Sequence, residues 1–355
     1  MRHLFIVDPL AGLNPNADTS VVFMREAARR GHAVASCDVA ALSVGPGGRA
    51  QARWVGLRVS ESHDWYALGE SGSGELGEFD VVWMRKDPPY DLNYFFATHL
   101  LELVPPTTLV VNSPRGLREV TEKLFILRFP DLCPESLVSR SIPELLAFRE
   151  KLGGEMIIKP LDGCGGEGVF HLTKDDRNVQ ALLELGTRHG TTYQIAQRYV
   201  PEVREGDKRI IVVEGEPVGA VLRVPQHYES RANFHVGGRA AKSPLGQRER
   251  EICARIGPAL REYGILFAGI DVIGSWLTEA FRGGKDPKSL DKEYVRRWLQ
   301  DQGYHGDGAP PTLPDDVRCE AARRYIETYE QLTGRTFEPA TDEPTARIRR
   351  SLRLV

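Results

Sequence analysis

The first part of the chain alternates short apolar runs with a segment of helical spacing. An apolar run at 4–7 ends in Asp8-Pro9, and residues 19–30 place apolar side chains about one helical turn apart before Gly31. Further apolar runs lie at 33–36, 79–84 and 109–111. Strands and a helix in this order predict an open α/β domain, in which ligands bind beyond the ends of the strands.

The pattern changes from residue 122 onward. Residues 157–160 predict a strand, which is followed by a glycine-rich loop at 163–168 and a second strand. Two further apolar runs, 209–213 and 218–224, predict a hairpin that turns at residues 214–216. We therefore expect a second domain that begins near residue 122.

A third change follows Phe281. Residues 282–287 predict a turn or linker, and two helices are expected at about 290–300 and 315–332. The last residues are basic, and we interpret them as a solvated tail rather than as a nucleic-acid-binding arm. The chain is thus divided into an N-terminal α/β substrate domain at 1–121, a second domain at 122–281 and a helical tail at 282–355.

Composition narrows the functional classes. The 355 residues include 46 basic and 49 acidic side chains, a formal net charge of −3, which argues against a general binder of nucleic acids or membrane surfaces. No apolar stretch reaches the 18 residues of a membrane span, and the first residues lack the apolar core of a signal peptide. Five cysteines without a C-x-x-C pair disfavour a disulfide framework and a zinc site. We expect a cytoplasmic protein with no nucleic-acid or membrane partner.

The glycine-rich loop is the first candidate for chemistry. Its glycines are Gly163, Gly165, Gly166 and Gly168. Their backbone could approach an anion closely and present N–H groups to it. The loop matches neither the Walker A motif nor the dinucleotide fingerprint, and a tight turn explains it equally well when it is taken alone. Lys159 before the loop and Lys123 upstream favour a flap that covers the phosphates of a nucleoside triphosphate.

Two carboxylates form the second candidate. If the chain turns around Ser275, Asp271 and Glu279 lie opposite each other on paired strands and share one face. Two such carboxylates repel each other unless a metal ion or a proton neutralises them. Acids on a solvated hairpin face are the alternative, but beside a triphosphate-binding loop the pair favours magnesium, with manganese as a second candidate.

Several motifs before residue 280 resemble bacterial glutathione synthetases of the ATP-grasp superfamily. They are Met84-Arg85-Lys86-Asp87-Pro88-Pro89, Glu122-Lys123-Leu124-Phe125, Ile158-Lys159-Pro160-Leu161-Asp162-Gly163, Gly206-Asp207-Lys208-Arg209 and Gly237-Gly238-Arg239. The resemblance implies an α/β protein with an ATP-grasp fold preceded by an open α/β (pre-ATP-grasp) domain. It places a lid at about 122–196 and a central part at about 197–281. Members of this family use ATP to join the cysteinyl carboxylate of γ-glutamylcysteine to the amine of glycine through an acyl phosphate.

The resemblance also implies roles for individual residues. Lys123 and Lys159 would bind ATP phosphates under the glycine loop, and Asp271 and Glu279 would bind magnesium. The other nucleotide-binding residues would be Gln197, Arg198, Tyr199, Val200 and Asp207, with the backbone of 197–200 against adenine. The substrate-binding residues would be Arg85, Arg231, Asn233, Gly237, Gly238 and Arg239. Arg209 would face the reacting phosphate, and Arg209 or Arg231 is the candidate donor to the oxyanion that forms when the amine displaces phosphate.

The resemblance breaks at Phe281. At this position the family has an asparagine that ligates magnesium, followed by a Ser/Thr/Pro loop that contacts the peptide, and both are missing from this sequence. Period-two alternation places Phe281 on the face of Glu279, and its ring cannot coordinate a hard cation. We therefore expect a ligase whose activity is impaired at one magnesium.

The tail resembles a different family. Residues 282–340 are similar to the C-terminal part of phosphoribosylaminoimidazole-succinocarboxamide synthase, but the ATP and substrate motifs of that enzyme are not found upstream. The chain therefore has the sequence of a chimera. A nucleotide-binding but catalytically silent chimera is the alternative function, and a purine-biosynthetic synthase is a more distant one. The expected ligands are ATP and small-molecule substrates. The sequence is compatible with a homo-oligomer and does not decide the oligomeric state.

Overall fold

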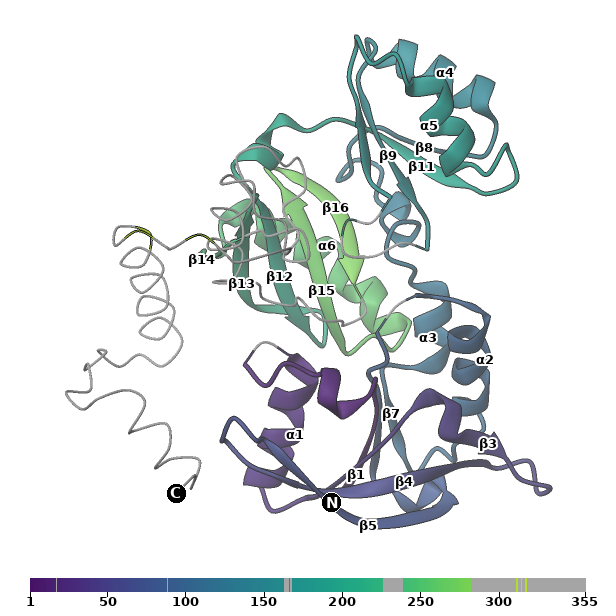
Figure 1. Cartoon of the computed structure of the whole chain (residues 1–355), viewed down its shortest axis with the longest axis vertical. Coiled ribbons are helices and arrows are strands. Elements are labelled where there is room, and N and C mark those ends of the chain that lie inside the picture. The colour runs from purple at the N-terminus through teal and green to yellow at the C-terminus, as the bar shows by residue number, and fades with distance from the viewer. Residues whose placement is uncertain are drawn as a thin grey trace. The chain divides into compact units, whose positions relative to one another are not determined.

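The computed structural model describes residues 1–16, 18–87, 89–162, 166, 168–225 and 239–281, and the single positions 311, 314 and 317. The chain divides into two units, Met1–Lys288 and Ser289–Val355. The strands and helices given below belong to the first unit (Figure 1). The tail helices expected at 290–300 and 315–332 lie outside the described residues, except at Val317, which is helical.

The N-terminal part forms a seven-stranded mixed sheet in the order β3-β4-β2-β1-β6-β7, with β5 paired to β4. Its strands are β1 (Arg2–Ile6), β2 (Ala33–Cys37), β3 (Leu42–Val44), β4 (Ala50–Val59), β5 (Tyr66–Glu75), β6 (Val81–Met84) and β7 (Leu109–Val111). The pairs β1/β2, β1/β6 and β6/β7 are parallel, as the α/β pattern predicts, whereas β3, β4 and β5 add an antiparallel extension. The carboxyl ends of β1, β6 and β7 therefore meet at one edge of the sheet.

Helices cover both faces of this sheet. They are α1 (Thr19–Arg29), α2 (Leu92–Leu101) and α3 (Pro114–Glu119). On one face α1 packs Val21 and Met24 against Phe5 of β1, and on the other α2 and α3 pack against Leu4 and Ile6. Alternate residues of the segment 4–7 thus enter two separate cores, which is why this segment is an uninterrupted apolar run.

The part of the chain expected to form the lid contains a four-stranded antiparallel sheet in the order β10-β9-β11-β8. It consists of β8 (Ser136–Ser139), α4 (Ile142–Lys151), β9 (Met156–Pro160), β10 (Phe170–Leu172), α5 (Val179–Gly186) and β11 (Gln194–Arg198). Met156 and Ile158 of β9 pack with both helices in one core. Because strand side chains alternate, Lys159 lies on the other face, which α4 and α5 leave uncovered (Figure 1).

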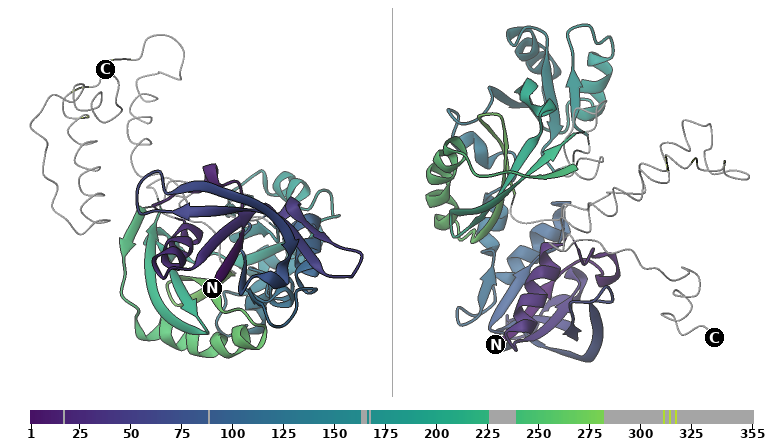
Figure 2. Two further views of the ribbon diagram at one scale, coloured as in Figure 1. Left: turned by 90° about the horizontal axis from the view of Figure 1, so that it is seen from below. Right: turned by 90° about the vertical axis from the view of Figure 1, so that its left-hand side faces the viewer.

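The central part is a five-stranded antiparallel sheet in the order β14-β13-β12-β15-β16. It consists of β12 (Asp207–Val213), β13 (Glu216–Val224), β14 (Arg239–Lys242), α6 (Gln247–Glu262), β15 (Phe267–Ile273) and β16 (Trp276–Phe281). Helix α6 runs along one face of this sheet, where Ile210 and Ile270 pack with Ile252 and Ile256 (Figure 2). The opposite face holds the charged side chains described next.

Candidate functional site

Lys159 of strand β9 lies beside a carboxylate of the central sheet. Its ammonium nitrogen lies 3.2 Å from Oε1 of Glu279 on β16, and both side chains are largely buried. The loop after β9 contains Gly166 and Gly168, whose φ angles of +84° and +68° lie in the left-handed region that favours glycine. The predicted loop residues Gly163 and Gly165 lie outside the described residues.

The second predicted lysine, Lys123, follows α3. It is buried, and its Nζ lies 3.9 Å from Oε2 of Glu122. Both lysines therefore lie beside a carboxylate, and neither charge is fully exposed to water. An ammonium group is a compact point charge on a flexible stem.

The predicted hairpin of β15 and β16 is confirmed. Asp271 lies opposite Glu279 in the antiparallel register, and the chain turns at Gly274 and Ser275. Ile270 and Val272, on either side of Asp271, are buried in the core under α6. Asp271 therefore lies on the face of the sheet opposite α6, where it is 1% exposed.

Two arginines hold Asp271 in place. Arg209 of β12, directly opposite Asp271, donates from Nε and Nη2 to its two carboxylate oxygens at 2.8 and 2.9 Å. Arg223 of β13 is completely buried and donates both to Asp271 and to Asp207, with 2.6 Å between its Nη2 and Oδ2 of Asp207. Two guanidinium groups and two carboxylates thus form one buried network. We name it the Asp207–Arg223–Asp271–Arg209 network.

The two aspartates of the network differ in pKa because Asp271 accepts hydrogen bonds from Arg209 and Arg223, whereas Asp207 accepts from Arg223 and is also repelled by the charge of Asp271. Burial raises the pKa of Asp207 to about 7, although Arg223 opposes this shift. Burial also acts to raise the pKa of Asp271, but Arg209 and Arg223 together outweigh it and lower that pKa below its ordinary value. Asp271 therefore stays ionised at neutral pH, as a metal ligand must.

Sequence analysis did not identify Arg223. The available signal was an arginine within the otherwise apolar strand Ala220-Val221-Leu222-Arg223-Val224. A charged residue at such a position is stable only when it is paired, and the partner here is a buried carboxylate.

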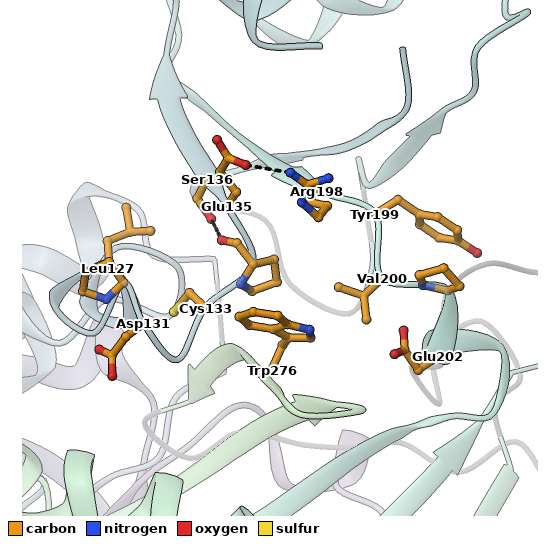
Figure 3. Close-up of a pocket in the computed structure, with 13 residues that line it drawn as sticks. Leu127, Asp131, Cys133, Glu135, Ser136, Arg198, Tyr199, Val200, Glu202 and Trp276 are labelled. Carbon is orange, nitrogen blue, oxygen red and sulfur yellow. Dashed lines mark hydrogen bonds and ion pairs between the residues drawn. The ribbon is translucent and has the colours of Figure 1, made fainter. Parts of the chain in front are cut away.

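A cavity of about 760 Å³ opens where the chain crosses between the lid and the central sheet (Figure 3). It is lined by parts of the segments 127–136 and 198–202 and by Trp276. An ion pair of 2.7 Å between Glu135 and Arg198 joins the two segments. Trp276, which sequence analysis did not single out, lies between Cys133 and Val200 in this view. The volume suits a small organic ligand.

Three of the four residues predicted to meet adenine line this cavity, namely Arg198, Tyr199 and Val200. The fourth, Gln197, is buried at the end of β11 and donates to Oγ of Ser136, a residue that lines the cavity, at 2.9 Å. Three of the residues predicted to meet adenine thus lie together at this cavity, while Lys123 and Lys159 are not among the residues that line it.

The residues predicted to bind the peptide substrate are described only in part. Arg85 is buried after β6, donates to the hydroxyl oxygens of Thr19 and Ser20, and lies over the rings of Phe23 and Phe267. The other predicted substrate residues are described only at the backbone of Arg239, which pairs with Val224, since Arg231, Asn233, Gly237 and Gly238 lie outside the described residues. The backbone of Phe281 pairs with Gly269.

Asp271 and Glu279 have the right chemistry for a hard cation. Their carboxylate oxygens are the donors that magnesium prefers, and magnesium is commonly held by one or two carboxylates together with phosphate oxygens and water. Within the described residues, no group of three or more His, Cys, Asp or Glu side chains is arranged to hold a metal ion.

Comparison with family models and with curated proteins gives matches that cover both domains. The model of the prokaryotic glutathione synthetase N-terminal domain matches residues 1–118, and that of the prokaryotic glutathione synthetase ATP-grasp domain matches residues 122–281. A glutathione synthetase of Mesorhizobium japonicum is 47% identical over 274 residues, which cover 77% of this chain and 87% of that protein. The glutathione synthetase of Gloeobacter violaceus is 47% identical over 286 residues, which cover 79% of this chain and 88% of that protein.

Solved structures agree on the fold. The D-cycloserine synthetase DcsG has a TM-score of 0.54 at 15% identity, with 79% of this chain and 92% of that chain covered. The ATP-grasp ligase PsnB bound to a minimal precursor has a TM-score of 0.52 at 17% identity, with 79% and 90% covered. The predicted α/β architecture with an ATP-grasp fold is confirmed. Among the described residues, no helix is long and apolar enough to cross a membrane.

Proposed function

The chain belongs to the prokaryotic glutathione synthetase family of ATP-grasp C–N ligases, and on that premise we propose that its substrates are γ-glutamylcysteine and glycine. The observation that supports the proposal best is the pairing of Asp271 and Glu279 on adjacent strands, each in contact with cationic side chains. An acyl phosphate forms when a carboxylate attacks the γ-phosphoryl group in line, and the protein mainly supplies positioning and positive charge for this step. The family models also support a domain division near residues 121 and 281, and we propose a cytoplasmic location.

We assign the following roles to the residues expected to bind the nucleotide and the metal ion. Lys123 and Lys159 would exchange their carboxylate neighbours for ATP phosphates, and Arg209 would face the transferred phosphoryl group. The adenine ring would lie against the backbone of 197–200. Asp271 and Glu279 would hold magnesium, which, when bound, neutralises charge on the phosphate oxygens. Holding Asp271 by two arginines keeps its carboxylate ionised and oriented before the nucleotide arrives.

Phe281 is the reason to expect reduced activity. Its backbone position lies two residues beyond Glu279 on β16, where the family has an asparagine ligand. A hydrocarbon ring offers no oxygen to a cation. We therefore propose that the chain binds ATP but turns over more slowly than a ligase with asparagine at this position.

The test is coupled release of ADP by the full chain with ATP, magnesium, γ-glutamylcysteine and glycine. Activity that requires both organic substrates supports the proposal. ATP binding without turnover would contradict it and favour the catalytically silent alternative. ADP release with carboxyaminoimidazole ribotide and aspartate instead would assign the purine-biosynthetic activity.

A pair of asparagine variants isolates the missing oxygen. Phe281→Asn should raise kcat by about tenfold or more, because it returns an amide oxygen to the proposed metal site. Leu185→Asn changes an apolar side chain that is 68% exposed at the end of α5, and it should leave kcat unchanged. Equal rates for wild type and Phe281→Asn would show that the ligand at 281 does not limit turnover.

A further inference from the structure

Three rings of the N-terminal sheet form a hydrogen-bonded row. The indole Nε1 of Trp83 on β6 lies 3.0 Å from Nδ1 of His3 on β1, and Nε2 of His3 lies 3.0 Å from Nδ1 of His32, which precedes β2. His3 is 7% exposed, and Trp83 and His32 are half-buried. The rings meet because β1 lies between β2 and β6 in the sheet. We name them the Trp83–His3–His32 relay.

The hydrogen bonds fix the positions of the protons in the relay. An indole nitrogen can only donate, so Nδ1 of His3 is the acceptor and carries no proton. A neutral imidazole has one N–H, which in His3 is therefore on Nε2 and is donated to Nδ1 of His32. Neutral His32 in turn keeps its proton on Nε2. Both hydrogen bonds of the relay are complete only in this single arrangement.

An added proton breaks one of these two bonds. On Nδ1 of His32 it would face the N–H of His3, and on Nδ1 of His3 it would face the N–H of Trp83. Only the second position leaves a strengthened bond, because a charged His3 ring donates from Nε2 to His32 more strongly than a neutral one. The acidic form therefore keeps the histidine pair and loses Trp83. Burial and the charge of His32 lower the pKa of His3 below 6.5, so this form appears only on acidification.

The charged groups around His3 are occupied by other partners. The Met1 amine opposes protonation of the ring, and Asp80 favours it. The Asp80 carboxylate accepts from the backbone N–H of Arg2 at 2.6 Å, and the Arg2 guanidinium donates to the carbonyl oxygen of Glu78 at 3.1 Å. The charged side chains of α1, which packs over this face, form ion pairs of their own, namely Arg25 with Glu61 and Glu26 with Arg29 and Arg30.

Trp83 connects the relay to the central sheet through aromatic rings. Its ring centroid lies 5.2 Å from that of Phe23 on α1, and Phe23 lies edge-on at 5.0 Å from Phe267, the first residue of β15. The guanidinium of Arg85 lies over both phenylalanine rings. Trp83 therefore holds α1 where it contacts β15, the strand that also carries Asp271.

We propose that the Trp83–His3–His32 relay is a proton-operated switch for the contact between the N-terminal sheet and the central sheet. With both histidines neutral, Trp83 is held against Phe23, and Phe23 packs against Phe267. A proton on His3 releases Trp83 and loosens this contact. The switch does not depend on the identity of the substrates, because the relay lies outside the residues proposed to bind ATP, the metal ion and the peptide.

The fluorescence of Trp83 in the full chain, followed from about pH 8 to about pH 5, tests the switch. The part of the emission that Trp83→Phe removes should decrease on acidification with a midpoint below pH 6.5, because an imidazolium quenches an adjacent indole. His3→Gln should abolish this transition, since glutamine does not titrate. His32→Gln should raise the midpoint, because its amide oxygen accepts from His3 without adding a charge. His189→Gln, at an exposed position after α5, is the matched control and should leave the midpoint unchanged.

Hydrogen exchange then tests the contact between the sheets. After correction for the intrinsic effect of pH, peptides that contain Phe23 or Phe267 should exchange about fivefold faster below the midpoint than above it, which corresponds to the loss of one hydrogen bond. This change should be absent from His3→Gln and present in His189→Gln. Circular dichroism shows whether each variant is folded.

Three results would overturn the proposal. They are a Trp83 emission that does not change with pH, a transition that persists in His3→Gln, and unchanged exchange at Phe23 and Phe267. If His3→Gln does not fold, His32→Gln decides, and an unchanged midpoint in that variant would overturn the proposal as well.

Discussion

Replacing Arg223 by glutamine would leave two buried carboxylates short of a cation. Arg223 is fully buried and donates at least three hydrogen bonds, two to Asp207 and one to Asp271. Asp271 would keep Arg209, whereas the nearest cation of Asp207 would be gone. Breaking a buried ion pair by removing one partner costs about 3–5 kcal/mol, because the other charge stays buried. We expect Arg223→Gln to lower the free energy of unfolding by about 4 kcal/mol at pH 7.

The loss should depend on pH in a defined direction. The folded pKa of Asp207 is raised to about 7, above its ordinary value of 3.8, so Asp207 contributes less stability as pH rises from about 4 to 7. Removing Arg223 raises this pKa further and weakens the lowering of the Asp271 pKa. Both effects destabilise the variant most where the carboxylates are ionised in the unfolded chain. The difference between variant and wild type should therefore shrink between pH 7 and pH 5.

Urea unfolding at both pH values measures this difference. With an m-value of about 3 kcal/mol/M, a loss of 4 kcal/mol moves the midpoint by about 1.3 M. Arg115→Gln is the matched control, since Arg115 forms only an exposed pair with Glu119 and should not move the midpoint measurably. A shift below about 0.3 M for Arg223→Gln, or a loss that grows on acidification, would refute the reasoning.

Three further changes test other parts of the fold by the same unfolding assay. Asn112 donates to the carbonyl oxygen of Phe267 at 2.8 Å and accepts from two backbone N–H groups. Asn112→Ala should therefore lower the free energy of unfolding by about 3 kcal/mol, and an unchanged midpoint would show that these hydrogen bonds do not stabilise the fold. Gly206 has a φ of +127°, and a Cβ there would lie 2.8 Å from a backbone oxygen, so Gly206→Ala should lower the free energy of unfolding by about 2 kcal/mol. In the control Gly219→Ala the added Cβ meets nothing within 4 Å, and the loss should be far smaller. Burial, together with the nearby His32 and N-terminal charges, lowers the pKa of His3 below 6.5. The unfolded chain therefore takes up a proton at this histidine first, and the free energy of unfolding should fall as pH drops below about 6.5. His3→Gln should reduce this pH dependence, and an unchanged pH dependence would exclude His3 as its source.

The strands that sequence predicted are those whose own residues are apolar. The runs at 4–7, 79–84 and 109–111 correspond to the parallel strands β1, β6 and β7; β1 and β6 are largely buried, whereas the edge strand β7 buries Val111 and leaves Leu109 51% exposed. Strand β5 has the sequence Tyr-Ala-Leu-Gly-Glu-Ser-Gly-Ser-Gly-Glu and is mostly exposed, so neither apolar content nor alternation marks it. Its conformation depends on pairing with β4, and sequence analysis did not predict the β4/β5 hairpin.

In the candidate site, too, contacts between residues close in sequence could be predicted, whereas contacts between distant residues could not. Asp271 and Glu279 were paired correctly from sequence, but the turn alone does not produce this register: Val272 pairs with Leu277, and an irregularity between Asp271 and Val272 brings Glu279 rather than Thr278 opposite Asp271. The contacts of Arg223 to Asp207 and Asp271 span 16 and 48 residues and depend on the order of β13, β12 and β15 in the sheet. A single sequence does not contain that order. An arginine in an apolar strand therefore indicates a buried charge, but it does not identify the carboxylates that pair with it.

The register of β16 also decides what Phe281 can change. Leu277 is buried under α6 and donates its N–H to the carbonyl oxygen of Leu132, which anchors the strand independently of residue 281. A slip by one residue would move Leu277 out of the core and Glu279 to the opposite face, at a cost far above that of a local change. A register shift separates the Val272–Leu277 pair from the Asp271–Glu279 pair, so Glu279 is held by its own pairing with Asp271 and by its ion pair with Lys159. Phe281→Asn leaves these contacts and the Leu277 anchor unchanged, and it therefore tests the oxygen that Phe281 cannot supply.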